Sequence, residues 1–407
     1  MKYHVYTLGC KFNLYESARI SEILDRAGHQ KSDPQDSDLI IINSCAVTSE
    51  AKRQSLQMAR HFKRISQAKI IFTGCAVHDD KIEDFDLVLG NGEKMRILDF
   101  INKNGKICDN AYFLHDDINY AVEKIPERTR GFLSIENGCN WGCTYCAIPH
   151  FRGTKIRSKP IDTVIEEAQK MVRSGIKEIV ISGINIALYD DNGLDLGKAL
   201  DLISKIDGDF RIRIGSIDPI NAIKIAWVFS ENQKMCHHIH LSLQSGSDKV
   251  LKDMGRPYRS DDVIRLAEKM REIDRFFAFS TDVICGFPTE DENDFLETVE
   301  LLKEIEVMRI HAFPFSPRRG TKAASLKSID GKEKKRRVNI LRSLSNELEY
   351  DSRKKMKFKQ RILVEEKSGD LCSGFSDYYL KYTFKDPESK VGDFVEIKEG
   401  DAFEDIS

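Results

Sequence analysis

In the first quarter of the chain, hydrophobic positions follow two kinds of pattern, one typical of strands and one typical of helices. Short, mainly apolar runs predict strands at residues 3–8, 39–43, 69–72 and 87–89. Between them, residues 13–27 carry apolar side chains at helical spacing, and residues 50–66 form a second helical segment that is rich in Lys and Arg. Strands that alternate with helices predict a parallel sheet covered by helices.

A second series of strand-like and helix-like segments begins at Gly131. Its candidate strands lie at residues 131–135, 178–182, 211–215, 238–243, 278–284 and 309–315. Helical segments such as 161–174 and 261–273 fit between them. These repeated units predict a complete or partial (β/α) barrel, an architecture in which catalytic residues sit at the carboxyl ends of the strands. We therefore expect an α/β fold in which a barrel follows an N-terminal parallel sheet.

The C-terminal part of the chain divides into a basic and an acidic segment. Residues 331–362 contain twelve Lys or Arg and four acidic residues, a local net charge of +8. This excess favours phosphate contact over a merely solvated helix face. Residues 363–407 contain twelve acidic residues and five Lys, a net charge of −7, in short alternating runs that predict a small β-domain. We expect three domains, at 1–118, 125–350 and 353–407.

The composition and net charge exclude some classes of protein. The 407 residues are 41% hydrophobic and 31% charged, which is typical of a globular protein. The net charge of −2 excludes a globally basic nucleic-acid binder but not local basic patches. There is no run of about 18 apolar residues to span a membrane, and the N-terminus lacks an apolar signal core. We expect a cytoplasmic protein whose ten cysteines stay reduced, as ligands, catalysts or core residues.

The strongest chemical signal is the loop ENGCNWGCTYC, which follows the first predicted barrel strand and contains Cys139, Cys143 and Cys146. Three closely spaced thiolates suit an iron–sulfur cube and leave one of its irons open to another ligand. Structural zinc takes four ligands, and His150 is the nearby residue that would complete a Cys3His site, the alternative interpretation. The position at the carboxyl end of a barrel strand favours catalysis.

A second set of three cysteines is spread over the N-terminal segment. Cys10, Cys45 and Cys75 each follow a predicted strand, and a small residue precedes each of them. The carboxyl ends of parallel strands share one edge of a sheet, so we expect the three thiols to converge there. A single Cys in such a position is more often a buried core residue, but three at matching strand ends favour a ligand set.

The C-x3-C-x-aromatic-C form of the second-domain loop resembles the radical S-adenosylmethionine superfamily, and the chain as a whole resembles its methylthiotransferase family. In the first domain the likeness rests on TLGCKFNLYES, INSCAVTSEA, FTGCAVH and VLGN. In the second it rests on ENGCNWGCTYC, FRG, SGIN, IHLSLQSGSDKVLKDMGRPY, STDVICGFPTE and HAFPFSPRRGTKA. The basic segment and the acidic tail are similar to the family's RNA-binding TRAM module.

This resemblance implies two [4Fe–4S] clusters and S-adenosylmethionine as cofactors. It implies an auxiliary cluster on Cys10, Cys45 and Cys75, and a radical-generating cluster on Cys139, Cys143 and Cys146. The residues implied for S-adenosylmethionine are Tyr145, Ser182, Gly183, Asn185, Gln244, Ser245, Gly246 and Arg256. The basic segment supplies the RNA-binding candidates Lys334, Lys335, Arg336, Arg337, Lys354, Lys355 and Lys357, and the basic helix at 51–64 is a second candidate face. No catalytic residue is implied beyond the cluster ligands.

The opening GCKFNLYES is most similar to the branch of the family that acts on N6-threonylcarbamoyladenosine in tRNA. It implies addition of a methylthio group to carbon-2 of this adenosine next to the anticodon, with one S-adenosylmethionine as methyl donor and another as radical source. The implied partners are that tRNA and a reducing electron donor, with neither a membrane nor DNA. The alternatives are the ribosomal-protein aspartate branch, the isopentenyl-adenosine tRNA branch, and a non-catalytic iron–sulfur RNA-binding protein.

Overall fold

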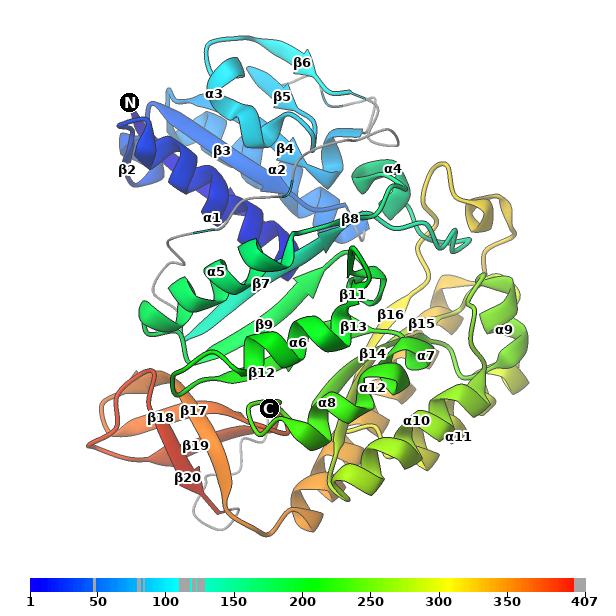
Figure 1. Ribbon diagram of the computed structural model, residues 1–407. Coiled ribbons are helices and arrows are strands. Elements are labelled where there is room, and N and C mark those ends of the chain that lie inside the picture. Colours follow the sequence, from blue (N-terminus) through cyan, green and yellow to red (C-terminus); the bar gives the residue numbers. More distant parts are fainter. Residues whose placement is uncertain are drawn as a thin grey trace.

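The computed structural model describes residues 1–46, 49–78, 82, 85–109, 118, 122 and 129–398. Figure 1 shows an N-terminal α/β unit and a C-terminal β unit on either side of a central barrel-like unit. Among the described residues, no helix is both long enough and apolar enough to cross a membrane.

The N-terminal unit is a parallel sheet with helices on both faces, as the alternating pattern predicts. Its strands lie in the order β2-β1-β3-β4-β5-β6. They are β1 (Lys2–Thr7), β2 (Gln30–Lys31), β3 (Leu39–Ser44), β4 (Lys69–Gly74), β5 (Leu87–Leu89) and β6 (Gly105–Ile107). Alternate side chains of β3 point to opposite faces. Ile40 packs with Phe62 of α2 (Ser49–Ile65), and Ile41 packs with Ile20 of α1 (Lys11–Arg26).

The central unit is a partial barrel of parallel strands. They run in sequence order as β7 (Arg130–Asn137), β9 (Glu178–Gly183), β12 (Arg211–Ile214), β14 (His238–Gln244), β15 (Ala278–Cys285) and β16 (Arg309–Pro314). A parallel bridge between Ile212 and Met235 joins the sheet that ends at β12 to the sheet that contains β14. Within the described residues no strand connects β16 back to β7, so the barrel is open on one side. Of the two predicted forms, complete or partial, the partial barrel is the one observed.

Helices cover the outer face of this barrel. The long ones are α5 (Ile161–Arg173), α6 (Leu196–Ser204), α10 (Ser260–Ile273), α11 (Glu292–Glu304) and α12 (Gly331–Lys355). Their apolar faces join one core with the strands; Val164, Leu266 and Leu341 are all below 1% exposed. The short helices of this unit are α4 (Ile148–Arg152), α7 (Pro219–Ala222), α8 (Ala226–Glu231) and α9 (Asp248–Asp253), whereas α3 (Ile97–Phe100) belongs to the N-terminal unit. The short strands of this region are β8 (Arg157–Ser158), β10 (Asp190–Asp191), β11 (Leu194–Asp195) and β13 (Ser216–Ile217).

The C-terminal unit is an antiparallel sheet docked at the amino-terminal end of the barrel strands. Its order is β19-β18-β17-β20, from β17 (Gln360–Ser368), β18 (Leu371–Ser376), β19 (Lys381–Lys385) and β20 (Phe394–Ile397). Arg211 and Arg213 on β12 are both paired with the buried Glu178, at 2.7 and 3.0 Å. The two guanidinium groups also donate to the carbonyl oxygens of Phe375 and Ser376, at 2.9 and 3.0 Å. A buried ionic network therefore fixes this sheet to the barrel.

Candidate active site

The first cysteine triad lies at the carboxyl edge of the N-terminal sheet. Cys10 directly precedes α1, Cys45 follows the last residue of β3, and Cys75 follows the last residue of β4. β1, β3 and β4 are neighbours in the sheet, so the three positions share one edge, as expected for parallel strands. Cys45 and Cys75 are buried, whereas Cys10 is exposed.

Two glycines let these strand ends approach one another closely. A Cβ at Gly9 (φ +106°) would lie 2.6 Å from the Cβ atom of Cys45. A Cβ at Gly74 (φ +94°) would lie 2.4 Å from the carbonyl oxygen of the residue before Cys45. Both φ values fall in the left-handed region that favours glycine. Cys10 and Cys75 in turn interact electrostatically. The small residues before these cysteines therefore serve the close approach of the triad.

A buried polar network connects this edge to the barrel. Arg152 on α4 is 1% exposed. Its guanidinium contacts both carboxylate oxygens of Glu16, with an Nη2–Oε2 distance of 2.9 Å, and donates to Asn13 Oδ1 at 2.9 Å. Lys94 Nζ lies 2.5 Å from Glu16 Oε2. Burial opposes ionisation of Glu16, but Arg152 and Lys94 lower its pKa below the ordinary value. Asn13 Oδ1 also lies 3.9 Å from Cys10 Sγ, so the network ends at the triad.

The second triad occupies the loop after β7, at the carboxyl end of the barrel. Backbone hydrogen bonds hold this loop: Thr144 N donates to Met254 O at 3.0 Å, and Cys146 N donates to Cys143 O at 3.2 Å. Cys146 interacts electrostatically with Cys143 and Cys139. Burial raises the pKa of the Cys146 thiol to about 12. Because iron binds the thiolate, cluster binding must release the thiol protons.

Arg256 lies directly beside this loop. Its Nη1 atom is 3.2 Å from Cys143 Sγ, its Nη2 atom donates to Ser242 O at 2.9 Å, and its Nε atom donates to Tyr258 Oη at 2.7 Å. The guanidinium also lies over the Trp141 ring, 4.8 Å from its centroid. Arg256 is one of the residues implied for S-adenosylmethionine. Packing and hydrogen bonds hold its guanidinium against a predicted cluster ligand, with only 8% of the residue exposed.

Glu136 organises the turn after β9. Its Oε2 atom accepts hydrogen bonds from the backbone N–H groups of Ile184 (3.0 Å) and Asn185 (2.6 Å). Its Oε1 atom is buried and has no hydrogen-bond partner among the described residues. Burial raises the pKa of this carboxyl well above its ordinary value. Asn185 Nδ2 lies 3.9 Å from Cys139 Sγ. An unpartnered polar atom therefore stands beside residues predicted to bind S-adenosylmethionine.

Neither triad is arranged to hold a single metal ion. Within the described residues, no three His, Cys, Asp or Glu side chains gather closely enough to hold one metal ion. A four-iron cube distributes its thiolates over separate irons, so its ligands stand farther apart than those of one zinc. His150, the candidate fourth zinc ligand, approaches Gly320, where a Cβ would lie 3.4 Å from its Nε2 atom. The Cys3His zinc alternative thus finds no support in the geometry.

The remaining residues predicted for S-adenosylmethionine divide into two groups. Those on strand ends and loops at the cysteine side of the barrel are Tyr145, Ser182, Gly183, Asn185, Gln244 and Arg256. Ser245 and Gly246 instead face α11. Gly246 N donates to Thr298 Oγ1 at 2.9 Å, and a Cβ at Gly246 would lie 2.6 Å from Thr298 Cα. Ser245 is 1% exposed, so both residues pack the loop after β14 against this outer helix.

The RNA-binding candidates do not form one surface. α12 has 25 residues and is about 37 Å long, so residues 334–337 and 354–357 lie at its opposite ends. Arg337 is 4% exposed and is paired with Glu290 and Glu333. Arg336 is paired with Glu292 at 2.5 Å. These two guanidinium groups therefore hold α12 against the loop and helix around residue 292.

The lysines of the same set differ in their surroundings. Lys334 donates to the carbonyl oxygen of Phe315 at 3.3 Å, and Lys355 is paired with Glu306 at 2.6 Å. The other three, Lys335, Lys354 and Lys357, are exposed. The two ends of α12 thus each present exposed lysine to solvent.

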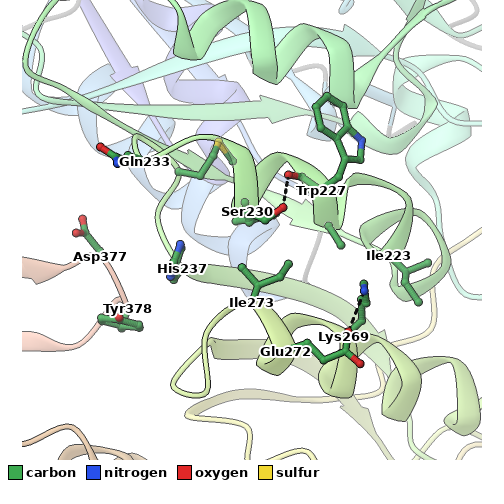
Figure 2. A pocket seen from close by; sticks show the side chains of 13 residues that line it. Ile223, Trp227, Ser230, Gln233, His237, Lys269, Glu272, Ile273, Asp377 and Tyr378 are labelled. Carbon is green, nitrogen blue, oxygen red and sulfur yellow. Dashed lines mark hydrogen bonds and ion pairs between the residues drawn. The ribbon is translucent and has the colours of Figure 1, made fainter.

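A cavity of about 900 Å³ lies between α8, α10 and the C-terminal sheet (Figure 2). His237, whose Nδ1 atom is 2.6 Å from Asp274 Oδ2, lines it, as does Tyr378, whose hydroxyl donates to the same oxygen at 2.8 Å. Because His237 directly precedes β14, the cavity lies at the other end of the barrel from the cysteine loop. It is separate from the candidate active site.

The other four cysteines have packing positions. Cys236, Cys285 and Cys372 are buried, and Cys108 is half-buried. Cys285 belongs to the barrel core and Cys372 to the core of the C-terminal sheet. None of the ten cysteines, all of which lie in the described part of the chain, forms a disulfide.

Four residues of the site were not singled out from the sequence. They are Asn13, Glu16, Glu136 and Arg152. All four stand inside motifs that carry the family resemblance, GCKFNLYES, ENGC and FRG. These four residues do not recur at a regular spacing along the chain. The only feature of the sequence that could have marked them as site residues was their polar character within the motifs.

Two family models match the chain. The model described as "Radical SAM superfamily" matches residues 133–302, and "Uncharacterized protein family UPF0004" matches residues 2–89. A relative from Thermotoga maritima, "Threonylcarbamoyladenosine tRNA methylthiotransferase MtaB", is 38% identical over 97% of this chain and 93% of the relative. A relative of the same name from Bacillus subtilis is 32% identical over 97% of this chain and 92% of the relative.

The radical S-adenosylmethionine methyltransferase TsrM from Kitasatospora setae, solved with cobalamin and a [4Fe–4S] cluster bound, has a similar fold. The TM-score is 0.58 with 13% sequence identity, over 79% of this chain and 77% of that chain. At this identity the likeness concerns the fold alone. Together with the near-full-length relatives, the two cysteine triads and the partial barrel show that the chain belongs to the methylthiotransferase family of the radical S-adenosylmethionine superfamily, which uses S-adenosylmethionine and [4Fe–4S] clusters.

Proposed function

We propose that the protein is a tRNA methylthiotransferase that adds a methylthio group to carbon-2 of N6-threonylcarbamoyladenosine next to the anticodon. The observation that carries this proposal is the similarity, over nearly the full length of both chains, to the Thermotoga maritima relative of that name. The two cysteine triads, each at the carboxyl ends of parallel strands, support the same chemistry.

When bound, the two clusters and S-adenosylmethionine supply the radical, the methyl group and the sulfur transfer. Cys10, Cys45 and Cys75 would hold one cluster, and the loop from Cys139 to Cys146 would hold the other. Glu136 orients the β9 turn, and Arg256 donates to Cys143 Sγ in the loop. α4 follows the loop directly, and its Arg152 reaches the residues beside Cys10. With both clusters bound, two reactive centres would thus lie on either side of one short helix.

The substrate base would be splayed out of the single-stranded anticodon loop, where no duplex has to be opened. Exposed lysines on α12 are candidates for contact with the RNA backbone, as the charge of this segment predicts. The basic helix α2 adds Arg60, Lys63 and Arg64, which line a surface hollow of about 720 Å³. An external reductant would provide the electron, and a reducing compartment such as the cytoplasm suits ten cysteines that form no disulfide in the described part of the chain.

The decisive experiment compares tRNA nucleosides from the source organism with those from a strain that lacks this gene. We expect mass spectrometry to show loss of the methylthio form of threonylcarbamoyladenosine, with the unmethylthiolated form accumulating. Plasmid-borne wild type should restore the product, and a Cys139→Ala variant should not. Persistence of the product in the deletion strain, where no other enzyme makes it, would refute the proposal.

The same deletion strain distinguishes between the alternative functions. Loss of the methylthio isopentenyl-adenosine signal would assign the chain to that branch, and loss of a methylthio group from a ribosomal-protein aspartate would assign it to the protein-modifying branch. If every modification persists and the purified, reduced protein binds tRNA without cleaving S-adenosylmethionine, the protein is a non-catalytic iron–sulfur RNA-binding protein.

A further inference from the structure

An exposed phenylalanine stands on the inner wall of the open barrel. β16 is the edge strand of the sheet β13-β14-β15-β16, and its residues Ile310 and Ala312 are buried in the core that the barrel strands share with the helices. Successive side chains of a strand point to opposite faces. His311 and Phe313 therefore face the barrel interior, where both are exposed; Phe313 is 43% exposed.

This side chain differs from the other phenylalanines of the protein. Phe313 is the only exposed one in the described part of the chain. It belongs to none of the hydrophobic clusters of those residues, and none of them places an aromatic ring or a cation against its ring. A single exposed apolar residue on an outer surface needs no explanation, but this ring faces the interior of the barrel.

The register of the sheet places Phe313 close to the cysteine loop. Phe313 is the second-last residue of β16, at the carboxyl end of the barrel, where the loop with the second triad also lies. It is paired with Ile284 on β15, and adjacent strands are about 5 Å apart. Ile284 and Tyr145, the aromatic residue of the cysteine loop, pack against the same buried cluster, which includes Phe315. Phe313 therefore lies one strand away from residues that pack with this loop.

Polar side chains adjoin the ring on the same wall. His311 lies two residues before Phe313, and the register sets Asp282 of β15 beside His311. Asp282 Oδ2 is 3.3 Å from His240 Nε2, and the rings of His240 and His311 are 5.6 Å apart. A flat apolar surface with hydrogen-bonding groups at its border matches a nucleobase, whose faces are apolar and whose edges carry donors and acceptors.

We propose that Phe313 is the platform on which the adenine ring of the substrate nucleotide stacks. The inference rests on the proposed function and names the side chain that holds the base for reaction at carbon-2. Single-stranded RNA bases are bound in this way, splayed out of a loop and stacked on aromatic side chains. Stacking uses the face of the base and leaves its edge, with carbon-2 and the N6 substituent, free to meet the reactive centres and the polar groups of the wall.

The placement favours the substrate base over the adenine ring of S-adenosylmethionine. Tyr145, which the family resemblance implies for S-adenosylmethionine, packs against the cluster that contains Phe315, and Phe315 is 5% exposed. Phe313 lies outside that cluster, on the edge strand at the open side of the barrel. An RNA loop can bring a base into the interior through this open side, and Phe313 is the exposed ring that the base meets there.

The test is a double-mutant cycle between the ring and the base. Two synthetic anticodon stem-loops are compared, a modified loop that carries threonylcarbamoyladenosine and a loop with an abasic site at the same position. Their binding to the reconstituted holoenzyme, without a reductant, is measured by fluorescence anisotropy. We expect Phe313→Ala to weaken binding of the modified loop about fivefold to a hundredfold, the range for one stacked base. Binding of the abasic loop should stay at the wild-type value.

Two further substitutions test whether the aromatic face is what matters. Phe313→Tyr keeps a ring and should retain the wild-type affinity for the modified loop, whereas Phe313→Leu keeps apolar volume without a π-face and should bind it nearly as weakly as Phe313→Ala. Leu296→Ala is the matched control: Leu296 is 48% exposed on α11, outside the barrel, and its replacement should change neither affinity. Iron content and circular dichroism check each variant. If Phe313→Ala fails these checks, the Tyr and Leu variants decide the question.

The inference is overturned if Phe313→Ala binds the modified loop as wild type does, if it weakens both loops equally, or if Phe313→Leu binds as tightly as Phe313→Tyr. It is also overturned if Phe313→Ala lowers the affinity for S-adenosylmethionine, measured by equilibrium dialysis without RNA, because the ring would then contact that cofactor. A different result overturns the proposed function: wild type that cleaves S-adenosylmethionine but converts no threonylcarbamoyl tRNA to product. The two failures are separable, because the binding cycle needs no turnover.

Discussion

Arg152 on α4 forms a buried ion pair with Glu16 on α1, across the boundary between the barrel and the N-terminal unit. Glu16 also forms an ion pair with Lys94. Arg152 also donates a hydrogen bond to Asn13, whose side chain lies beside Cys10. Charges that are this deeply buried are stable only when each has its partner. The pair therefore links the loop that carries the second triad to the helix that begins at the first.

Replacement of Glu16 by Gln should leave two buried cations without a counter-charge. We expect a loss of about 3–5 kcal/mol in the free energy of unfolding, measured by urea titration. The iron content after reconstitution should fall toward that of one cluster, because α1 begins at Cys10. Glu166→Gln is the control: this exposed residue pairs with Lys170, and its loss should cost about 1 kcal/mol or less. Equal stability of Glu16→Gln and wild type would contradict the role assigned to the pair.

Arg256→Met should change the electronic properties of the second cluster. The guanidinium is 3.2 Å from Cys143 Sγ, and hydrogen bonds to the ligand sulfurs tune the reduction potential of such clusters. Without the cationic donor the potential should become more negative, and S-adenosylmethionine cleavage should slow by about tenfold to a hundredfold. Redox titration followed by electron paramagnetic resonance measures the first effect. Arg265→Met, an exposed residue of α10, should show neither change; an unaltered potential in Arg256→Met would count against the argument.

The stability of the protein should depend on the ionisation of Glu136. Burial raises the pKa of this carboxyl well above 4.5 in the folded state. Below about pH 4.5 both folded and unfolded states hold the proton. As pH rises, the unfolded state releases it first, so wild type loses stability until the folded pKa is passed. Glu136→Gln cannot ionise, and its amide oxygen can still accept the two backbone N–H groups.

We therefore expect the Tm of Glu136→Gln to gain on that of wild type as the pH is raised from about 5 to 8. Differential scanning fluorimetry of the metal-free proteins gives both curves. A difference in Tm that does not change with pH would show that Glu136 ionises as freely in the folded state as in the unfolded chain.

Glu178→Gln should loosen the C-terminal sheet. Although burial opposes ionisation, Arg213 and Arg211 lower the pKa of Glu178 well below its ordinary value. The stabilisation from this network is therefore present above about pH 4.5 and is lost as the pH falls toward the folded pKa. At neutral pH the variant should be less stable by about 3–5 kcal/mol. Amide hydrogen exchange in β17 and β18 should accelerate more than exchange in β3 and β4.

Asp209→Asn is the matched control for this experiment. Asp209 is exposed and also reaches the C-terminal unit, through Arg361 at 2.6 Å. An exposed pair contributes little, so exchange in β17 and β18 should stay near the wild-type rate. If both variants behave alike, burial of the Glu178 network is not what holds the sheet.

Most of the architecture could be predicted from the local pattern of apolar and polar residues. The predicted strands at 178–182 and 278–284 differ from β9 and β15 by one residue at their ends. Both cysteine triads are also evident in the amino-acid sequence, because thiols at short spacing, or at successive strand ends, form a pattern along the chain itself. Strand and helix periods depend on neighbouring residues, which is why they can be read locally.

The amino-acid sequence by itself determined the succession of strands and helices, the six candidate cluster ligands and the charge division at the C-terminus. Only the tertiary structure decided which charged side chains are buried in ion pairs and which are exposed to a ligand. It buried Arg337 and Arg152 in ion pairs and turned Ser245 and Gly246 toward α11. The reason is physical: the partner of a charge is set by distance in space, and residues such as Glu16 and Arg152 are brought together by packing alone.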